Sequence, residues 1–207
     1  MALWLLPVYG LLLMLSTLTH EPDHTEDFAA WSRYVTTDVF VVSHVVGSIL
    51  GAGLGLVGVM AALVLLVRGP VPVAATVGAA MTVVGNVCFT SVFAAAAYAQ
   101  PAIGRAYLAG RPGAEDLYDD VYGTPLLVVF GVGALLFVAG AVVLGRALAR
   151  TAPGLRWAGY GYAASLVLFL VAGFTVSVVQ PVTGAAVAVA ATVIARRLPA
   201  SVAGPRL

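Results

Sequence analysis

Residues 38–68 read DVFVVSHVVGSILGAGLGLVGVMAALVLLVR, and no Asp, Glu, Lys or Arg lies between Asp38 and Arg68. A helix needs about 20 consecutive apolar residues to cross the roughly 30 Å hydrocarbon core of a bilayer. This stretch is long enough to cross with some tilt, so it predicts a membrane-spanning helix. It also contains His44, a histidine at membrane depth.

Small and polar residues within this stretch recur at spacings of three and four. They are His44, Gly47, Ser48, Gly51, Gly55 and Gly58. Such spacing places them on one helix face, and a glycine ridge lets another helix approach closely within lipid. Because intramembrane ionisable residues usually face a partner or a cavity, we expect His44 on this packing face. The alternative is a neutral imidazole with a structural hydrogen bond only.

The composition of the whole chain favours a membrane protein. Of its 207 residues 61% are hydrophobic and 9% are charged, whereas soluble domains carry about 25% charged residues. We therefore predict an all-α, polytopic integral membrane bundle whose main partner is the lipid bilayer, with no nucleic-acid partner. The basic residues are all arginine, and Ala, Gly and Val are abundant. This composition is typical of a GC-rich bacterial genome and suggests the bacterial plasma membrane.

Six apolar runs predict six transmembrane helices in a single domain, residues 1–198. The predicted spans are 2–18, 38–67, 73–99, 124–148, 157–179 and 182–197. A disordered cytoplasmic tail is expected at 199–207. The last span is short, and five spans with a re-entrant end is the alternative. Residues 2–18 could also be a signal peptide, although they lack a basic start.

The loops between these spans segregate charge. All nine acidic residues fall at 20–38 and 100–123, together with only three arginines, whereas the other seven arginines fall on the opposite side. Basic residues stay on the cytoplasmic side of a membrane. The pattern predicts that both termini are cytoplasmic and that the acidic loops are extracytoplasmic. Within the first acidic loop, an amphipathic helix is expected to begin near Asp23, with Phe28 and Trp31 on its apolar side.

A shift of eighty positions aligns parts of the chain with one another. Gln100-Pro101 falls on Gln180-Pro181, and Gly51 and Gly53 fall on Gly131 and Gly133. Such a pattern indicates a parallel duplication of a helical hairpin, helices 2–3 and 4–5. Chance similarity is the alternative in a chain of such low complexity.

Polar residues in the third span suggest a ligand site. Thr82, Asn86 and Thr90 lie four residues apart and share a helix face. An amide near the midplane needs hydrogen-bond partners, so this face should look into the bundle. With His44 and Ser48 it would form an outward-facing polar pocket, the usual kind of ligand site in a bundle.

The histidines also suggest a divalent metal site, formed by His20, His24 and His44 with nearby carboxylates. Such a set suits Zn²⁺ or Cu²⁺, whereas a solvated acidic loop is the simpler interpretation. An internal bis-histidine haem is not expected because only His44 lies in a span. A retinal Schiff base is excluded because the chain has no lysine.

Three functions remain open from the sequence. The first is a binding or transport module for a small ligand or cation, with its pocket around His44 and Asn86. The second is an accessory subunit, or a homo-oligomer, that associates through its glycine ridges. The third is an intramembrane enzyme on a lipid-like substrate that uses His44 as acid or base. Neither the substrate nor any other cofactor is specified by the residues.

Overall fold

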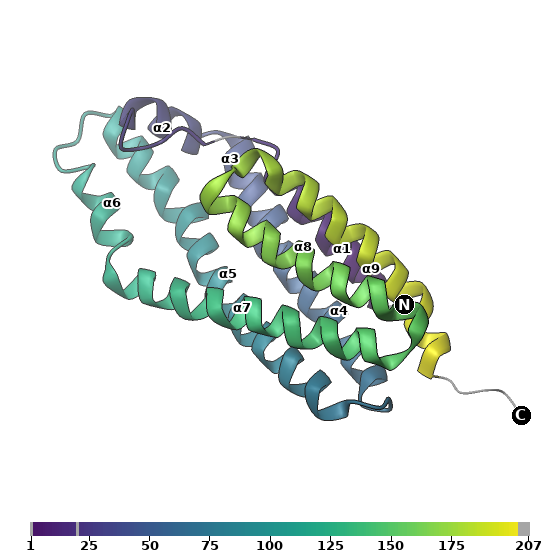
Figure 1. Ribbon diagram of the computed structural model, residues 1–207. Coiled ribbons are helices and arrows are strands. Elements are labelled where there is room, and N and C mark those ends of the chain that lie inside the picture. Colours follow the sequence, from purple (N-terminus) through teal and green to yellow (C-terminus); the bar gives the residue numbers. More distant parts are fainter. Residues whose placement is uncertain (1, 20, 203–207) are drawn as a thin grey trace, which may run out of the picture.

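The computed structural model describes residues 2–19 and 21–202, and every regular element within them is helical (Figure 1). Five helices of this part are long and apolar enough to cross a membrane. They span Asp38–Leu66, Pro72–Leu108, Thr124–Thr151, Pro153–Thr175 and Ser177–Val202. The chain is therefore an all-α bundle with the character of a membrane-embedded protein.

The first predicted span is a shorter apolar helix. It consists of a 3₁₀ turn η1 (Ala2–Trp4) followed by α1 (Leu5–Ser16), about 22 Å in all at 1.5 Å per residue. It lies between α4 and α9. Gly10 of α1 allows α9 to approach closely, and Gly55 of α4 allows α1 to approach α4. A Cβ atom on Gly10 would collide with the backbone of Ala188, and one on Gly55 would lie 2.8 Å from the Tyr9 ring.

The span that begins at Asp38 contains three helical segments. These are α3 (Asp38–Val42), the π-helix η2 (Ser43–Leu50) and α4 (Gly51–Leu66). Thr37 caps α3, because its hydroxyl accepts from the backbone N–H of Phe40 at 3.3 Å. A π-helix uses i→i+5 hydrogen bonds and is a frequent feature of functional sites. Here it contains His44.

The third span is much longer than the sequence pattern predicts. Helix α5 (Pro72–Leu108) has 37 residues and runs through Pro101 without a break. The expectation that the helix ends near Ala99 is therefore wrong. At about 1.5 Å per residue, α5 is roughly 55 Å long and extends well beyond a single membrane crossing.

The extended end of α5 is covered by a short helix, α2 (Phe28–Val35). Asp27 caps α2 by accepting from the Ala30 N–H at 2.7 Å, so the helix starts at Phe28, five residues after Asp23. Trp31 and Val35 are fully buried and form a small separate core with Phe40, Ala96 and Ile103. The apolar side of this expected amphipathic helix thus packs largely on the protein itself.

The remaining chain forms the other half of the bundle. In order it contains α6 (Asp116–Val121), α7 (Thr124–Thr151), η3 (Pro153–Leu155), α8 (Arg156–Thr175), η4 (Ser177–Val179) and α9 (Gln180–Val202). Helix α8 ends at Thr175, earlier than expected, and α9 is a full-length helix. Residues 199–202 continue α9 where a disordered tail was expected, and residues 203–207 lie outside the described part.

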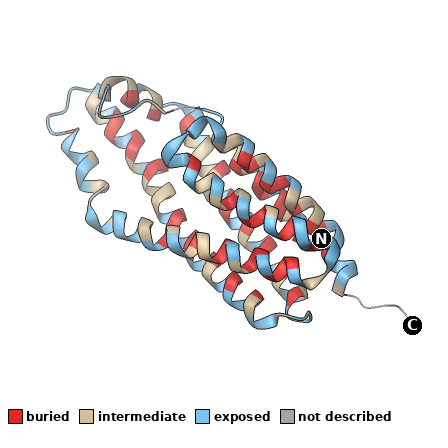
Figure 2. Ribbon diagram, viewed as in Figure 1, coloured by how far each residue is buried: buried red, intermediate tan, exposed pale blue. Residues whose placement is uncertain are grey.

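Close glycine contacts hold α5 against α7, and buried residues concentrate along such seams (Figure 2). A Cβ on Gly78 would lie 2.6 Å from the Leu144 nitrogen, and one on Gly85 would lie 2.6 Å from the Phe137 nitrogen. Backbone approach of this kind maximises van der Waals contact, which drives helix association in lipid.

The glycine ridge of the second span is also used inside the chain. Gly47, Gly51, Gly55 and Gly58 face Ser16, Leu12, Tyr9 and Leu6 of helix α1, in that order. The ridge is therefore covered by α1, and an external partner would need another surface. Association with a partner or a second copy stays a prediction.

The two Gln-Pro pairs of the suggested repeat lie in different settings. Gln100-Pro101 is inside the uninterrupted helix α5, whereas Gln180-Pro181 begins α9 after the η4 turn. The two segments that the duplication relates therefore differ in helical structure at their Gln-Pro pairs, and the duplication stays a prediction.

The turns fall into two groups at opposite ends of the bundle (Figure 1). One end carries α2, α6 and the α8–α9 turn. The other carries the α4–α5 turn, the α7–α8 turn and both ends of the described chain.

Candidate functional site

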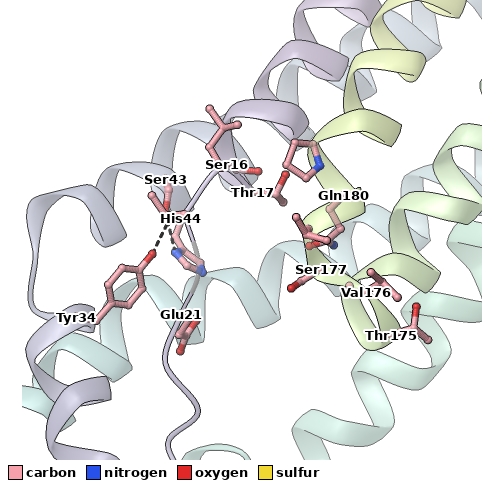
Figure 3. A pocket seen from close by; sticks show the side chains of 15 residues that line it. Ser16, Thr17, Glu21, Tyr34, Ser43, His44, Thr175, Val176, Ser177 and Gln180 are labelled. Atoms are coloured by element: carbon pink, nitrogen blue, oxygen red, sulfur yellow. Dashed lines mark hydrogen bonds between the residues drawn. The ribbon is translucent and has the colours of Figure 1, made fainter.

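A polar cavity of about 790 Å³ opens at the end of the bundle that carries α2 and α6. Figure 3 shows its two walls, one with Tyr34, Glu21 and His44 and the other with the α8–α9 turn. Ten of its fifteen lining residues have polar side chains and none is arginine. The lining residues are Ser16, Thr17, Leu18, Thr19, Glu21, Tyr34, Ser43, His44, Gly173, Thr175, Val176, Ser177, Val178, Gln180 and Pro181.

His44 is held by the start of the π-helix. Its Nδ1 lies 3.0 Å from the Phe40 carbonyl oxygen, and the Ser43 hydroxyl donates to the same oxygen at 2.8 Å. Since a carbonyl can only accept, Nδ1 carries the proton. In the neutral imidazole Nε2 is therefore the acceptor. The ring also packs against Phe40 in a tilted arrangement, with centroids 4.2 Å apart. His44 thus offers a fixed acceptor to the cavity.

The segment between α1 and α2 forms the outer wall. The Trp31 indole N–H donates to Glu21 Oε1 at 2.7 Å, and the Tyr34 hydroxyl donates to Thr19 Oγ1 at 2.8 Å. Both bonds tie this segment to α2, which is itself anchored on α5. The Glu21 carboxylate is consequently positioned beside the cavity by a buried tryptophan.

The opposite wall comes from the break between α8 and α9. Gln180 Nε2 donates to the Phe169 carbonyl oxygen at 3.2 Å. A Cβ on Gly173 would lie 2.5 Å from the same Nε2, so Gly173 makes room for the Gln180 side chain. The sequence alone does not assign Tyr34 or Gln180 to a site, and it offers Glu21 only as one of the carboxylates near the suggested metal site. The Gln180-Pro181 pair marks an interruption of the apolar run in the sequence, but it does not indicate which residues lie across from it.

The structure does not bring His44 and Asn86 together. Asn86 and Ser48 line a separate cavity of about 40 Å³ surrounded by aromatic and aliphatic side chains. The Asn86 amide donates to the Thr82 carbonyl oxygen of its own helix at 2.9 Å. The hydroxyls of Thr82 and Thr90 likewise donate to the carbonyl oxygens of Gly78 and Asn86. A ligand role for this strip stays a prediction.

The structure describes two of the three histidines of the predicted metal site, His24 and His44. The His24 ring packs against Tyr118 in a tilted arrangement with ring centroids 4.1 Å apart, and its Nδ1 is 3.9 Å from Asp23 Oδ1. Among the described residues no group of three His, Cys, Asp or Glu side chains could hold an ion. His20 lies outside those residues, so the set of His20, His24 and His44 stays a prediction.

An aromatic cluster between α2, α5 and α6 supports the outer wall. Burial first, and then the charges of Glu21, Asp119 and Asp23, raise the pKa of Tyr118 to about 12. Burial likewise raises the pKa of Tyr122, whose hydroxyl accepts from Gln100 Nε2 at 2.7 Å. These two tyrosines, stacked with centroids 4.6 Å apart, therefore stay neutral at physiological pH.

At the exposed edge of this region, hydrogen bonds from the Thr25 hydroxyl and amide lower the pKa of Asp23. The carboxylate is thus ionised in the folded protein. It adds to the negative charge of the end that carries the cavity.

No protein-family model, curated protein or solved structure matches the chain.

Proposed function

We propose that this protein is an integral membrane protein that binds a small polar or cationic ligand in an extracytoplasmic pocket around His44. The cavity of about 790 Å³ carries the proposal. Ligand sites for small molecules measure roughly 300–1,000 Å³ and combine a concave shape with a few convergent polar groups. A binding or transport module fits such a site.

Charge favours a cation. Glu21 contributes a carboxylate to the pocket, His44 contributes an acceptor, and no arginine is among the lining residues. The acidic loops at 20–38 and 100–123 carry nine acidic residues and three arginines, a net charge of −6. Because a cleft lined by one sign of charge concentrates the opposite ion, this end would attract cations and disfavour anions.

The proposed topology has six spans with both termini in the cytoplasm of a bacterial cell. The segregation of charge supports it, because Arg68, Arg150 and Arg196 belong to turns or helix ends opposite α2 and α6 (Figure 1). Positive residues remain inside. The Arg196 guanidinium also lies 5.9 Å from the centre of the Trp4 ring, a pairing suited to a membrane interface.

Helix α1 is short, but in this proposal it also crosses the membrane and brings the number of spans from five to six. The outward residues of η1 and α1 are between 38% and 51% exposed, namely Trp4, Val8, Leu11 and Leu15. They recur at spacings of three and four and so form one apolar stripe. Such a stripe suits contact with lipid, while the opposite face of α1 is covered by α4 and α9.

Ligand binding is tested with ethylamine and ethyl phosphate as small cationic and anionic probes. We expect the purified protein to bind ethylamine more tightly than ethyl phosphate in calorimetric titrations. His44→Ala should abolish ethylamine binding, whereas His24→Ala, which removes a histidine outside the pocket, should leave binding unchanged. Equal effects of the two substitutions, or equal binding of the two probes, would contradict the proposal.

Topology is tested by labelling single cysteines in a Cys88→Ala background. A membrane-impermeant maleimide added to intact cells should label Asp119→Cys and not Arg68→Cys; both parent residues are exposed. Labelling of Arg68→Cys alone would reverse the proposed orientation.

A further inference from the structure

A third cavity lies on the flank of the bundle, beside the polar pocket. It is a groove of about 410 Å³ between α1 and the α3–η2 segment. Leu12 and Leu15 form one side of the groove, and Val39, Val42 and Val46 form the other. The three valines and Leu15 are between 40% and 56% exposed. Side chains of this kind on the flank of a membrane bundle face hydrocarbon.

The groove and the polar pocket share a boundary. Ser16 and Ser43 line both cavities. Each hydroxyl donates to a carbonyl oxygen of its own helix, Ser16 to Leu13 at 3.0 Å and Ser43 to Phe40 at 2.8 Å. Two small side chains, each bonded within its own helix, therefore stand where the apolar groove meets the polar pocket.

The depth of the groove corresponds to one leaflet. It extends from Asp38 at the outer end of α3 to Gly47, nine residues that rise about 13 Å at 1.5 Å each. One leaflet contributes roughly half of the 30 Å hydrocarbon core. A chain lying in this groove would occupy the outer leaflet with its polar end level with Asp38 and the pocket.

Charge defines the polar end of the occupant. The lining of the two cavities includes the carboxylates of Asp38 and Glu21 and no arginine. Burying an anionic headgroup beside two carboxylates would be strongly unfavourable, whereas an amine would be attracted.

We propose that the ligand is a single-chain amphiphile with an amine headgroup that enters sideways from the outer leaflet. Its amine occupies the pocket at Glu21 and His44, and its hydrocarbon chain lies between Leu12, Leu15 and the valines of α3 and η2. This proposal rests on the proposed function and specifies the ligand class of the same site.

The test uses the whole protein in phosphatidylcholine nanodiscs with dodecylamine that carries a photoreactive diazirine at its chain end. Irradiation should attach the probe near Leu12 and Val46, at the deep end of the groove, and excess ethylamine should reduce the labelling. Val42→Trp should fill the groove and lower the labelling about tenfold, the factor expected when roughly two CH₂ groups lose their burial. Val64→Trp, at an equally exposed position of the same span, is the matched control and should leave the labelling unchanged.

Labelling spread over all lipid-facing helices, or insensitive to Val42→Trp, would overturn the proposal. If ethylamine still binds in a His44-dependent manner, the pocket stands and the lateral groove alone is refuted. If ethylamine does not bind either, the proposed function fails as well. Equal labelling by the matching dodecyl phosphate probe would refute the amine headgroup.

Discussion

The contact between α5 and α7 leads to a prediction that two glycines of one helix can test. Gly140 and Gly131 both belong to α7, but their surroundings differ. A Cβ on Gly140 would lie 2.6 Å from the Thr82 nitrogen and 2.7 Å from Thr82 Oγ1, whereas a Cβ on Gly131 would meet nothing within 4 Å. Gly140→Ala therefore introduces a collision with α5, whereas Gly131→Ala changes the same helix without one.

The size of the effect follows from the distances. Ordinary contact begins at 3.4 Å, so a Cβ at 2.6 Å from a backbone nitrogen is too close by 0.8 Å. The obstacle is backbone, so α5 and α7 must move apart. Overpacking of this kind costs about 1–3 kcal/mol. Both substitutions also gain up to about 1 kcal/mol of helix propensity. Since that gain is common to the two variants, Gly140→Ala should be less stable than Gly131→Ala by about 1–3 kcal/mol.

The measurement is equilibrium unfolding of both variants in mixed micelles with increasing sodium dodecyl sulfate, followed by far-ultraviolet circular dichroism. We expect Gly131→Ala to match or exceed the wild type and Gly140→Ala to unfold at lower detergent fraction. Identical unfolding curves would show that α5 and α7 do not approach at Gly140, and the packing argument would be refuted.

Three further changes test the outer wall and the inner strip. Trp31→Phe removes the donor to Glu21 and should lower the free energy of unfolding by about 2 kcal/mol, and an unchanged unfolding curve would exclude this bond. Tyr118 ionises near pH 10 when unfolded and at about 12 when folded, so the folded state holds its proton longer. The contribution of Tyr118 to the free energy of unfolding should be fully present below pH 10 and decline as the pH rises towards 12. The decline should be less steep in Tyr118→Phe. Tyrosinate absorbance and circular dichroism would measure it. Asn86→Leu should leave ethylamine binding unaltered in calorimetric titrations, because Asn86 bonds to Thr82 away from the pocket.

Hydropathy predicts the membrane helices because lipid requires long apolar segments with internally satisfied backbones. It fails at the outer end of α5, where Gln100 and Pro101 resemble a helix end. Both are buried in the structure, as is Ile103 under α2. A proline within a helix costs about 3 kcal/mol. Packing against segments distant in the sequence offsets that cost. A local hydropathy pattern does not contain this packing and therefore cannot predict it.

The candidate site could likewise be predicted only in part from the sequence. His44 could be found from the sequence because it is the one histidine within a span. The wall that contains Gln180 could not, since Gln180 is 136 positions away and the pocket exists only once α9 lies beside α1. Ser48 shows the same limit, because α-helical spacing places it on one face with His44 and Gly47, whereas the segment is π-helical. Gly47 of that segment contacts α1, whereas Ser48 lines the inner cavity with Asn86.

The π-helix provides the last prediction, because it fixes the direction of His44 relative to the glycine ridge. A π-bulge accommodates one residue more than the α-helix would. Deleting Val45 should remove that extra residue and restore α-helical hydrogen bonding, with the flanking residues kept on their faces. Deleting Val57, an exposed residue of the regular helix α4, has no such compensation and should rotate residues 38–56 by about 100° relative to the rest of α4. We therefore expect the Val45 deletion to retain ethylamine binding and the Val57 deletion to abolish it, because His44 would then leave the pocket. Loss of binding in the Val45 deletion would show that the π-helix does not accommodate an extra residue beside His44.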